Sequence, residues 1–311
     1  MERIFSDEAI PTALRGAIIA LGNFDGFHAG HQAVVARAVA LARAQGRPVI
    51  VATFDPHPVR LFHPEAVFFR LTTLDQRERL FAAAGADAML VFHFDAALAA
   101  KSAGEFVALL VERFGAAGVV TGEDFTFGHG RSGDVEVLRQ LGAAHGLIAQ
   151  AVPPVLDEHG EVISSSRIRD ALVAGDCATA SRLLTRPFAI RGPVIHGDKR
   201  GRTIGFPTAN MELDHYLRPA YGIYAVRVRL PDGRLLPGAA NLGIRPTFDP
   251  PKELLETFLF DFSGSLYDQV IEVELIERLR GEEKFDSLEI MVEQIHRDAA
   301  EARRILTPDF G

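Results

Sequence analysis

The chain has 311 residues, of which 48% are hydrophobic and 24% are charged. This length is sufficient for two domains with a core each, and the composition is typical of a soluble globular protein. The net charge of −8 argues against a nucleic-acid partner, because a broad basic surface is needed to hold a phosphate backbone.

Cys177 is the single cysteine, which excludes an internal disulfide and a multi-thiolate zinc site. The segment Met1–Leu14 carries Glu2, Asp7 and Glu8 and has no sustained apolar core, so it does not resemble a signal peptide. The sequence also contains no run of about 20 apolar residues, as a membrane span would need. We therefore expect a cytoplasmic protein with no membrane partner. The sequence indicates no particular oligomeric state.

From residue 17 to about residue 155, strand-like and helix-like segments alternate. The apolar patterns predict strands at 17–21, 48–54, 88–94, 118–121 and 147–155, and helices at 32–43, 73–84, 102–114 and 134–146. Thr73 with Gln76, and Ser102 with Glu105, have the spacing of capping boxes. This alternation predicts an α/β fold, a doubly wound and mainly parallel sheet with helices on both faces. In such folds, ligands bind beyond the carboxyl ends of the strands.

Helices are expected at 164–174 and 176–184, and the character of the chain then changes near residue 185. Strand-like runs separated by Gly and Pro follow at 188–195, 221–230, 235–242, 256–262 and 270–279, before a final helix at about 287–305. Closely spaced strands with Gly/Pro turns predict a compact antiparallel β-barrel, on which the terminal helix would pack. We therefore divide the chain into domains 1–184 and 185–311 at a shift in composition, not at a disordered linker.

The segment Gly22–His31 (GNFDGFHAGH) lies where the first predicted strand leads into a helix. Backbone N–H groups and the helix dipole favour an anion at this position, and glycine lets a phosphate approach closely. His28 and His31 are one helical turn apart and could stabilise phosphate oxygens that gain charge in a transition state. The alternatives are a metal site that includes Asp25, or two partly exposed turn histidines. The glycines and the strand-to-helix setting favour phosphate.

Three further segments lie near predicted strand ends or helix starts. Asp124, in TGEDFTFG, could accept hydrogen bonds from a ribose or a base, with Phe125 or Phe127 against a planar ligand; taken alone, such an acidic residue is more often a turn cap. The run 164–169 (SSSRIR) offers hydroxyls, N–H groups and arginines that could clamp a triphosphate, or simply serine caps and solvated arginines. The run 54–58 (FDPHP) could form a rigid wall of the same crevice, with His57 structural.

In the second half, residues 192–210 are rich in glycine and basic residues but lack the P-loop pattern. Thr208 and Asn210 offer neutral oxygens, which suit Mg²⁺ shared with substrate phosphates. Glu256 begins a strand-like segment, where a carboxylate near a substrate hydroxyl could act as general base for phosphoryl transfer. Its alternative is an ordinary surface charge at a strand end.

Together these motifs resemble, over nearly the whole chain, the bacterial bifunctional riboflavin kinase/FMN adenylyltransferases, often called FAD synthetases. GNFDGFHAGHQ resembles the His-x-Gly-His signature of nucleotidyltransferases, and TFDPHP, TGEDFTFG and SSSRIR resemble further adenylyltransferase motifs. GRTIGFPTAN, NLGIRPTF, ETFLFDF and LRGEEKF resemble riboflavin kinase motifs. His-x-Gly-His alone marks a superfamily, whereas GRTIGFPTAN together with ETFLFDF is highly specific. The chain departs from the family pattern at Asp268, where many members have Gly, and at Ser166, where Thr is common.

The resemblance implies a Rossmann-like nucleotidyltransferase domain followed by a β-barrel riboflavin kinase domain. It implies a transferase with two activities: ATP-dependent phosphorylation of riboflavin to FMN, then adenylylation of FMN by ATP to FAD with release of pyrophosphate. Mg²⁺ would serve both steps, and the partners would be small molecules alone. Rival interpretations are an enzyme with one activity, a flavin sensor without chemistry, and a nucleotidyltransferase for another phosphate such as phosphopantetheine.

The resemblance also assigns residues. Catalysis falls to His28, His31 and Glu256. The ATP site of the adenylyltransferase comprises Gly22, Asn23, Phe24, Asp25, Gly26, Gly30, Asp124, Ser164, Ser165, Ser166, Arg167 and Arg169. The ATP and flavin site of the kinase comprises Gly197, Gly201, Arg202, Gly205, Pro207, Thr208, Asn210 and Arg280, with Thr208 and Asn210 as Mg²⁺ ligands. From their positions beside strand ends, we further expect Phe54, Phe62 and Phe127 to stack on the flavin in the first domain.

Overall fold

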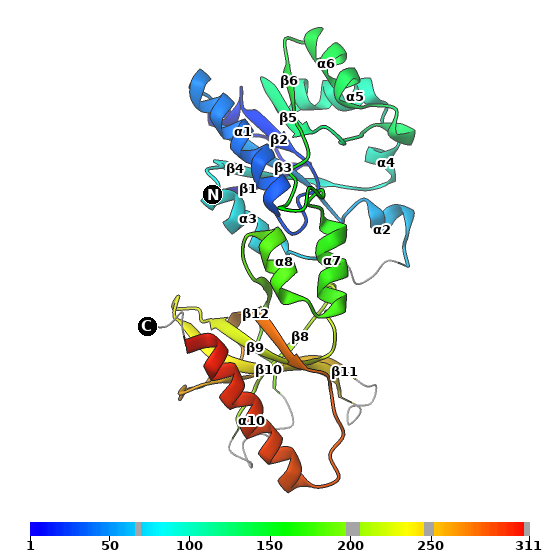
Figure 1. The fold of residues 1–311 in the computed structure, drawn as a ribbon. Coiled ribbons are helices and arrows are strands. Elements are labelled where there is room, and N and C mark those ends of the chain that lie inside the picture. Colours follow the sequence, from blue (N-terminus) through cyan, green and yellow to red (C-terminus); the bar gives the residue numbers. More distant parts are fainter. Residues whose placement is uncertain (66–69, 197–205, 246–251, 308–311) are drawn as a thin grey trace. The chain divides into compact units, whose positions relative to one another are not determined.

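The structure, a computed structural model, describes residues 1–65, 70–196, 206–245 and 252–307. The chain forms two compact units (Figure 1). The first comprises Met1–Val67 and Thr73–Ser164, and the second comprises Phe68–Thr72 and Ser165–Gly311. Within the described ranges, every helix is too short or too polar to cross a membrane.

A six-stranded sheet forms the centre of the first unit. In spatial order its strands are β1 (Glu2–Phe5), β4 (Ala88–His93), β3 (Val49–Asp55), β2 (Ile18–Leu21), β5 (Gly118–Gly122) and β6 (Ile148–Val152). All neighbouring strands run parallel, which confirms the predicted doubly wound sheet. The carboxyl ends of β2, β3 and β5 therefore meet at one edge of the sheet, where such folds bind ligands.

Helices cover both faces of this sheet. They are α1 (Ala29–Gln45), α2 (Val59–Phe62), α3 (Leu74–Ala83), α4 (Ala96–Ala99), α5 (Ala103–Ala108) and α6 (Val135–Ala143), with a π-helical turn at Leu109–Arg113 and 3-10 turns at Thr12–Leu14 and His129–Arg131. Both predicted capping boxes are present: Thr73 and Gln76 exchange hydrogen bonds at the start of α3, and Ser102 and Glu105 do so at the start of α5.

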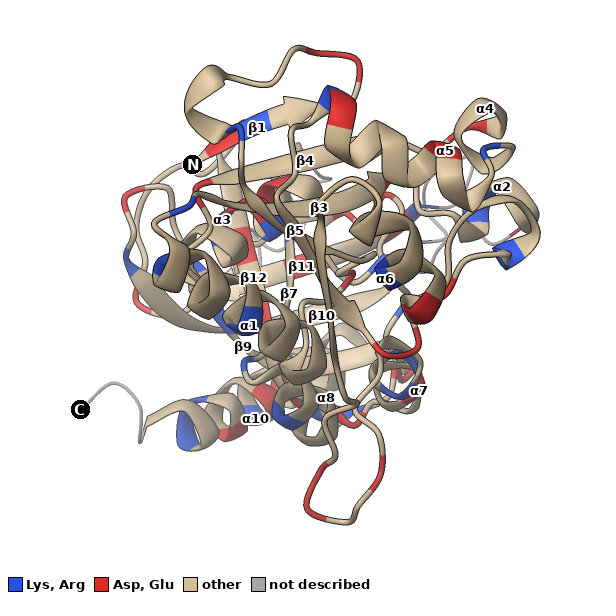
Figure 2. Cartoon of the chain, turned by 90° about the horizontal axis from the view of Figure 1, so that it is seen from above, with Lys and Arg blue, Asp and Glu red and all other residues tan. Residues whose placement is uncertain are grey.

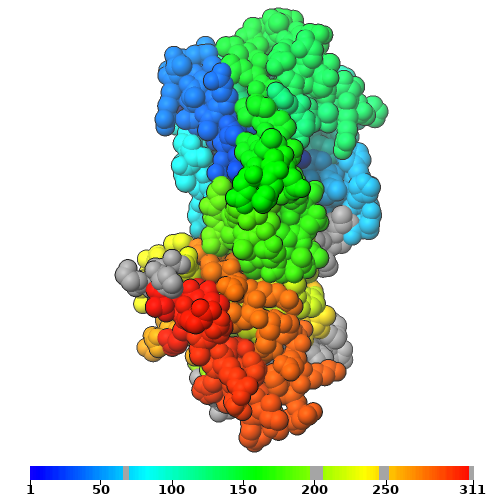
Figure 3. Space-filling model, viewed as in Figure 1, coloured from blue at the N-terminus to red at the C-terminus, as the bar shows by residue number. Residues whose placement is uncertain are grey.

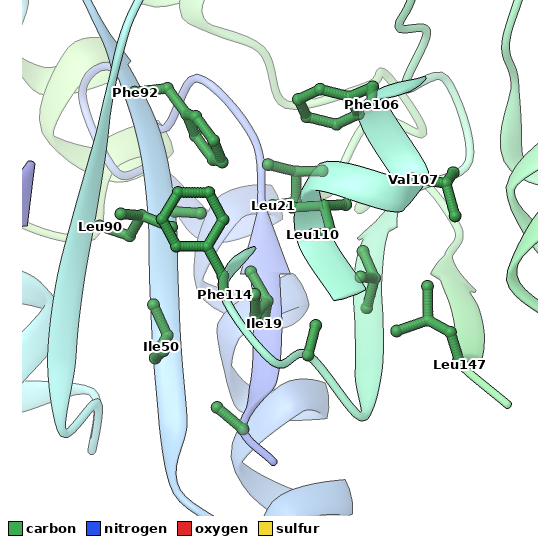
Figure 4. Packing of buried hydrophobic residues seen from close by; sticks show 14 of the residues in the cluster. Ile19, Leu21, Ile50, Leu90, Phe92, Phe106, Val107, Leu110, Phe114 and Leu147 are labelled. Atoms are coloured by element: carbon green, nitrogen blue, oxygen red, sulfur yellow. The ribbon is translucent and has the colours of Figure 1, made fainter. Parts of the chain in front are cut away.

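The fully apolar β2 shows why these strands read as continuous hydrophobic runs. Successive strand residues point to opposite faces, so Ile18 and Ala20 join the core beneath α1, whereas Ile19 and Leu21 join the core on the other face. The second of these cores, shown in Figure 4, also contains Ile50, Leu90, Phe92, Phe106, Val107, Leu110, Phe114 and Leu147. Each face of the sheet thus has its own core.

The sequence pattern does not predict β1, which pairs in parallel with β4 at the edge of the sheet. Its Arg3 donates hydrogen bonds to Asp75 (2.7 Å) and Glu78 (2.8 Å) of α3. A short edge strand held partly by ion pairs carries no apolar alternation from which it could be recognised.

A six-stranded antiparallel sheet forms the second unit. In spatial order its strands are β7 (Phe188–Pro193), β12 (Val270–Arg280), β9 (Gly222–Arg229), β10 (Leu235–Arg245), β11 (Lys252–Leu259) and β8 (Ala209–Glu212). Just beyond β7, Ile195 N–H donates to the carbonyl of Asn210 in β8 (2.8 Å), which brings the two edges together. The predicted antiparallel barrel is therefore confirmed as a nearly closed one.

Two details of this sheet differ from the sequence-based prediction. The sequence pattern does not predict β8, which begins at the end of the motif GRTIGFPTAN. The sequence pattern places Glu256 at the beginning of a strand, but β11 starts at Lys252 and Glu256 lies in its interior. The first residues of β11 are Lys252 and Glu253. Because both are charged, a search for apolar strand patterns does not detect where this strand begins.

The terminal helix α10 (Leu288–Leu306) packs on the outside of the barrel, as predicted. Ser287 caps it by accepting a hydrogen bond from Ile290 N–H (3.3 Å). Its Ala302 and Leu306 lie in one buried cluster with Ala225 of β9. In the space-filling view, the red helix lies directly against orange segments of the same unit (Figure 3).

Charged side chains on the barrel are arranged in pairs across strands. Arg229 of β9 contacts Glu274 of β12 (3.2 Å), and Arg191 of β7 contacts Glu272 of β12 (4.0 Å). Acidic and basic positions are likewise interspersed along the rest of the chain (Figure 2). The net charge of −8 thus comes from a modest acidic excess spread over the chain.

Helices α7 (Ser165–Ala174) and α8 (Cys177–Leu184) belong to the second unit. Leu172 and Leu183 are fully buried, and the carbonyl of Leu172 accepts a hydrogen bond from Ala220 N–H (3.0 Å). The composition shift near residue 185 marks the change from helices to strands, whereas packing joins both helices to the barrel.

Candidate functional site

The loop Gly22–Phe27 connects β2 to α1 at the carboxyl edge of the parallel sheet. Phe24 and Phe27 both have positive φ angles, 51° and 46°, which bulky residues rarely adopt. Both rings are buried, and both pack edge-on against Phe81 of α3, at 5.7 and 5.1 Å between centroids. The core therefore holds the backbone of this loop in a strained shape, as is common where a loop positions a ligand.

His28 and His31 lie together at the start of α1. His28 is the N-cap residue and is 6% exposed. Its ring stacks on that of His31, with 3.7 Å between centroids and 23° between planes. Gly30 allows this approach, because a Cβ at that position would lie 3.1 Å from Cε1 of His28. Two imidazoles and the first N–H groups of a helix thus lie together, an arrangement whose chemistry suits an anion.

A buried arginine supports the same loop from below. Arg77 of α3 is 2% exposed and donates to Thr53 Oγ1 (2.8 Å) and to the carbonyl of Asn23 (3.3 Å). Thr53 in turn donates to the same carbonyl (2.7 Å). Asp55 lies 3.9 Å from the guanidinium and offsets part of its charge. The sequence gives no sign of this role for Arg77, since an arginine in an amphipathic helix usually points to solvent.

We expect Arg77→Met to lower the FMN adenylylation that the resemblance implies about tenfold to a hundredfold, because displacement of positioned groups by about 1 Å has effects of that size. Riboflavin phosphorylation should be unchanged. Arg79→Met, at an exposed position of the same helix, is the matched control. Steady-state rates with FMN and ATP test the expectation. A folded Arg77→Met protein with the full rate would show that the network does not position the loop.

Asp124 lies just beyond the carboxyl end of β5, at the same edge of the sheet as the loop Gly22–Phe27. Its side chain is exposed, so it can accept hydrogen bonds from a ligand. The hydroxyl of Thr121, the buried residue three positions earlier, has no hydrogen-bond partner among the described residues. The structure therefore brings Asp124 to the edge that carries His28 and His31.

The predicted phosphate clamp 164–169 crosses from one unit to the other. Ser164 ends the first unit, and the carbonyl of Ile163 before it lies 3.6 Å from a Cβ built on Gly30. Ser165, Ser166, Arg167 and Arg169 lie in the first half of α7, in the second unit. The role of these four residues in an ATP site stays a prediction.

The three phenylalanines expected to contact flavin differ in exposure. Phe54 and Phe127 are each 7% exposed and belong to a core of the first unit. Phe62 of α2 is 64% exposed, and its ring packs edge-on against Phe94, which in turn packs against Phe54. Of these three, Phe62 has the face most accessible to a planar ligand.

The polar residues of the kinase half meet in one row across the barrel. In the strand register, Asn210 of β8 lies opposite Glu256 of β11, and Glu256 lies opposite Asn241 of β10. Directly paired residues point to the same face with Cβ atoms about 5 Å apart. The Oδ1 atoms of both asparagines are buried and have no hydrogen-bond partner among the described residues. Asn241 lies in the motif NLGIRPTF, but its local sequence does not distinguish it as a site residue.

Thr208 immediately precedes β8 and is half-buried, while Pro207 before it is exposed. Gly197, Gly201, Arg202 and Gly205 lie outside the described residues. Among the residues described, no three His, Cys, Asp or Glu side chains gather into a metal site. The uncharged oxygens of Thr208 and Asn210 suit a cation whose other ligands come from a substrate.

Arg280 lies at the end of β12, opposite Ile223 of β9. Its guanidinium forms a bidentate ion pair with the carboxylate of Asp298 in α10, with Nε–Oδ1 and Nη2–Oδ2 distances of 3.0 and 2.8 Å. Asp298 is 6% exposed. Arg280 therefore ties α10 to the barrel near the polar row, and its predicted contact with flavin stays a prediction.

Comparison with known proteins covers both halves of the chain. Residues 10–167 match the family model for FAD synthetase, and residues 184–306 match that for riboflavin kinase. The Escherichia coli (strain K12) bifunctional riboflavin kinase/FMN adenylyltransferase is 40% identical over 93% of this chain and 92% of its own. The Bacillus subtilis (strain 168) protein of the same name is 36% identical over 93% and 92%.

A solved structure described as a macrolide-efflux protein from Streptococcus pneumoniae superimposes with a TM-score of 0.86 at 34% identity. It covers 98% of this chain and 99% of its own. Two family models and relatives matched over almost their whole length thus cover both halves of the chain. The chain belongs to the family of bifunctional riboflavin kinase/FMN adenylyltransferases.

Proposed function

We propose that this chain converts riboflavin to FMN at the barrel and FMN to FAD at the parallel sheet, with ATP as co-substrate of both steps. The observation that carries the proposal is the occurrence of two separate polar sites. One is the stacked pair His28 and His31 at the start of α1, and the other is the row Asn210–Glu256–Asn241. Each site matches the chemistry of the family model that covers it.

In the adenylyl step, a phosphate oxygen of FMN attacks the α-phosphorus of ATP, and the bond to the β-phosphate breaks to release pyrophosphate. Charge accumulates on the phosphate oxygens in this transition state. His28 and His31, with the N–H groups at the start of α1, would stabilise it by donating hydrogen bonds to those oxygens. The loop Gly22–Phe27 would cradle the nucleotide, and Asp124 would accept from its ribose or base.

In the kinase step, the terminal ribityl hydroxyl attacks the γ-phosphorus of ATP, and ADP leaves. Glu256 would accept the proton of that hydroxyl, as a carboxylate in the interior of a strand is held in place for this role. Mg²⁺, when bound, neutralises charge on the transferred phosphate, and the oxygens of Thr208 and Asn210 would hold it. The buried Oδ1 of Asn210, without a partner among the described residues, fits such an ion.

The remaining assignments are proposals of the same kind. Phe62 would stack on the flavin of FMN, while Phe54 and Phe127 would support it from the core. Ser164–Arg169 would complete the ATP site of the adenylyltransferase. We propose the functional division near residue 185, since the riboflavin kinase model begins at residue 184. We also propose a cytoplasmic location, since both steps would use ATP, with small molecules as the partners.

Incubation of the protein with riboflavin, ATP and Mg²⁺, followed by chromatographic separation of flavins, tests the proposal. FMN should appear first and FAD should follow. If FMN accumulates and no FAD forms, the adenylyltransferase assignment is wrong. The protein would then be a riboflavin kinase whose first unit has no catalytic role. If neither flavin product forms, both assignments are wrong.

A further inference from the structure

The row Asn210–Glu256–Asn241 contains one residue, Asn241, for which the reaction described above has no use. All three side chains point outward from the barrel, because the neighbouring residues in each strand, such as Thr257 and Leu242, are fully buried in its interior. Glu256 stands in the middle, with one carboxamide on each side. The two asparagines thus occupy equivalent positions about the proposed general base.

Along the strand direction, different groups lie on the two sides of the row Asn210–Glu256–Asn241. Two residues along on one side, Phe258 and Ala239 pack into the buried cluster beneath α10. On the other side is Gly243, where an added Cβ would overlap Oε1 of Glu282. The polar row is therefore a strip between the apolar contact with α10 and the carboxylate of Glu282.

The Oδ1 of Asn241 is buried and accepts no hydrogen bond from the described residues. An amide oxygen removed from water without a donor is unfavourable, so a buried one beside a reactive carboxylate calls for an explanation. A hydroxyl group is the simplest donor, and the proposed acceptor substrate carries several along its ribityl chain.

The order of groups along the row indicates which substrate lies against Asn241. In-line transfer places the phosphoryl donor and the acceptor on opposite sides of the phosphorus. If Asn210 helps to hold the phosphate and its cation, the acceptor chain extends from Glu256 towards the other carboxamide. Strands lie about 4.8 Å apart, so side chains on two adjacent strands can converge on neighbouring hydroxyls of one polyol chain.

We propose that Asn241 is a specificity-determining residue of the kinase site, which binds the ribityl hydroxyl next to the one that is phosphorylated. Its carboxamide accepts from that hydroxyl while Glu256 accepts from the reacting one. This inference rests on the proposed riboflavin kinase activity. It makes the barrel selective for acceptors with vicinal hydroxyl groups.

The test compares riboflavin with 4′-deoxyriboflavin, which lacks the neighbouring hydroxyl. The wild-type protein should prefer riboflavin in kcat/KM by about tenfold to a hundredfold, because loss of this hydroxyl leaves a buried carboxamide unsatisfied. In Asn241→Ala the preference should fall to about twofold or less, mainly through a higher KM for riboflavin. The KM for ATP should not change. Because each preference is a ratio within one enzyme, it does not depend on the fraction of folded protein.

Thr257→Val is the matched control. Thr257 follows Glu256, is fully buried in the barrel interior, and its Oγ1 also has no partner among the described residues. This variant should keep the wild-type preference. An undiminished preference in Asn241→Ala, or an equal loss in Thr257→Val, would overturn the inference. If Asn241→Ala has no measurable rate, Asn241→Leu, which keeps the size of the side chain but has no hydrogen-bonding group, replaces it under the same criterion. A wild-type protein that fails to phosphorylate riboflavin would instead overturn the proposed function.

Discussion

Replacement of both His28 and His31 by alanine should reduce FMN adenylylation by at least about 10³-fold, because removal of a single preorganised donor to a developing oxyanion commonly lowers kcat by about 10² to 10³. Riboflavin phosphorylation should continue at the wild-type rate, since the barrel carries its own polar row. Rates of FAD formation from FMN, and of FMN formation from riboflavin, measure the two effects separately.

The geometry makes the histidine prediction specific. The two rings stack at 3.7 Å and His28 is the N-cap residue of α1, so the double variant removes both imidazoles from the start of this helix. The exposed His145 and His159, replaced together by alanine, form the control. Retention of adenylylation in the first double variant would show that the helix N-terminus alone suffices. Loss in the control variant would show a general effect of removing histidines.

Glu256→Gln should lower riboflavin phosphorylation by about 10² to 10⁴-fold, the usual contribution of a positioned general base. Glutamine keeps the shape of the side chain and can form hydrogen bonds, but it cannot accept the proton. FMN adenylylation should be unaffected. The measurement is FMN formation at saturating ATP, with Glu274→Gln as a control that removes another half-buried strand carboxylate.

The fold of the second unit can be checked in the same samples through Cys177. This thiol is 4% exposed, and burial raises its pKa to about 12. Thiolate is the reactive form, so labelling by a thiol reagent should be slow until the unit unfolds. If Glu256→Gln resists labelling like the wild type and still phosphorylates riboflavin at full rate, Glu256 is not the base.

The sequence predicts most of the fold because each half obeys one simple pattern. Buried parallel strands such as Ile18–Leu21 are apolar throughout, and capping boxes such as Thr73 with Gln76 mark where helices begin. The strands that escape prediction, β1 and β8, have four residues each and contain polar side chains. Such short strands form because they pair with neighbouring strands, β1 with β4 and β8 with β11, and a local sequence pattern does not show this pairing.

The candidate sites are predictable to the extent that their residues are close in sequence. His28 and His31 fall on one helical turn, so spacing alone brings them together. Asn210, Glu256 and Asn241 come from three strands, and only the register of those strands aligns them. Arg77 reaches the loop at Asn23 through the core, and its sequence position carries no sign of this contact. Tertiary packing supplies what local sequence patterns lack.

The central claim is that the chain carries two independent active sites, and a mixing experiment tests it most directly. The His28→Ala, His31→Ala double variant and the Glu256→Gln variant are each incubated with riboflavin, ATP and Mg²⁺, first separately and then together. Separately, the first should stop at FMN and the second should leave riboflavin nearly unchanged. Together they should form FAD, because the kinase of one supplies FMN to the adenylyltransferase of the other. A mixture of the two folded variants that forms no FAD would contradict the account.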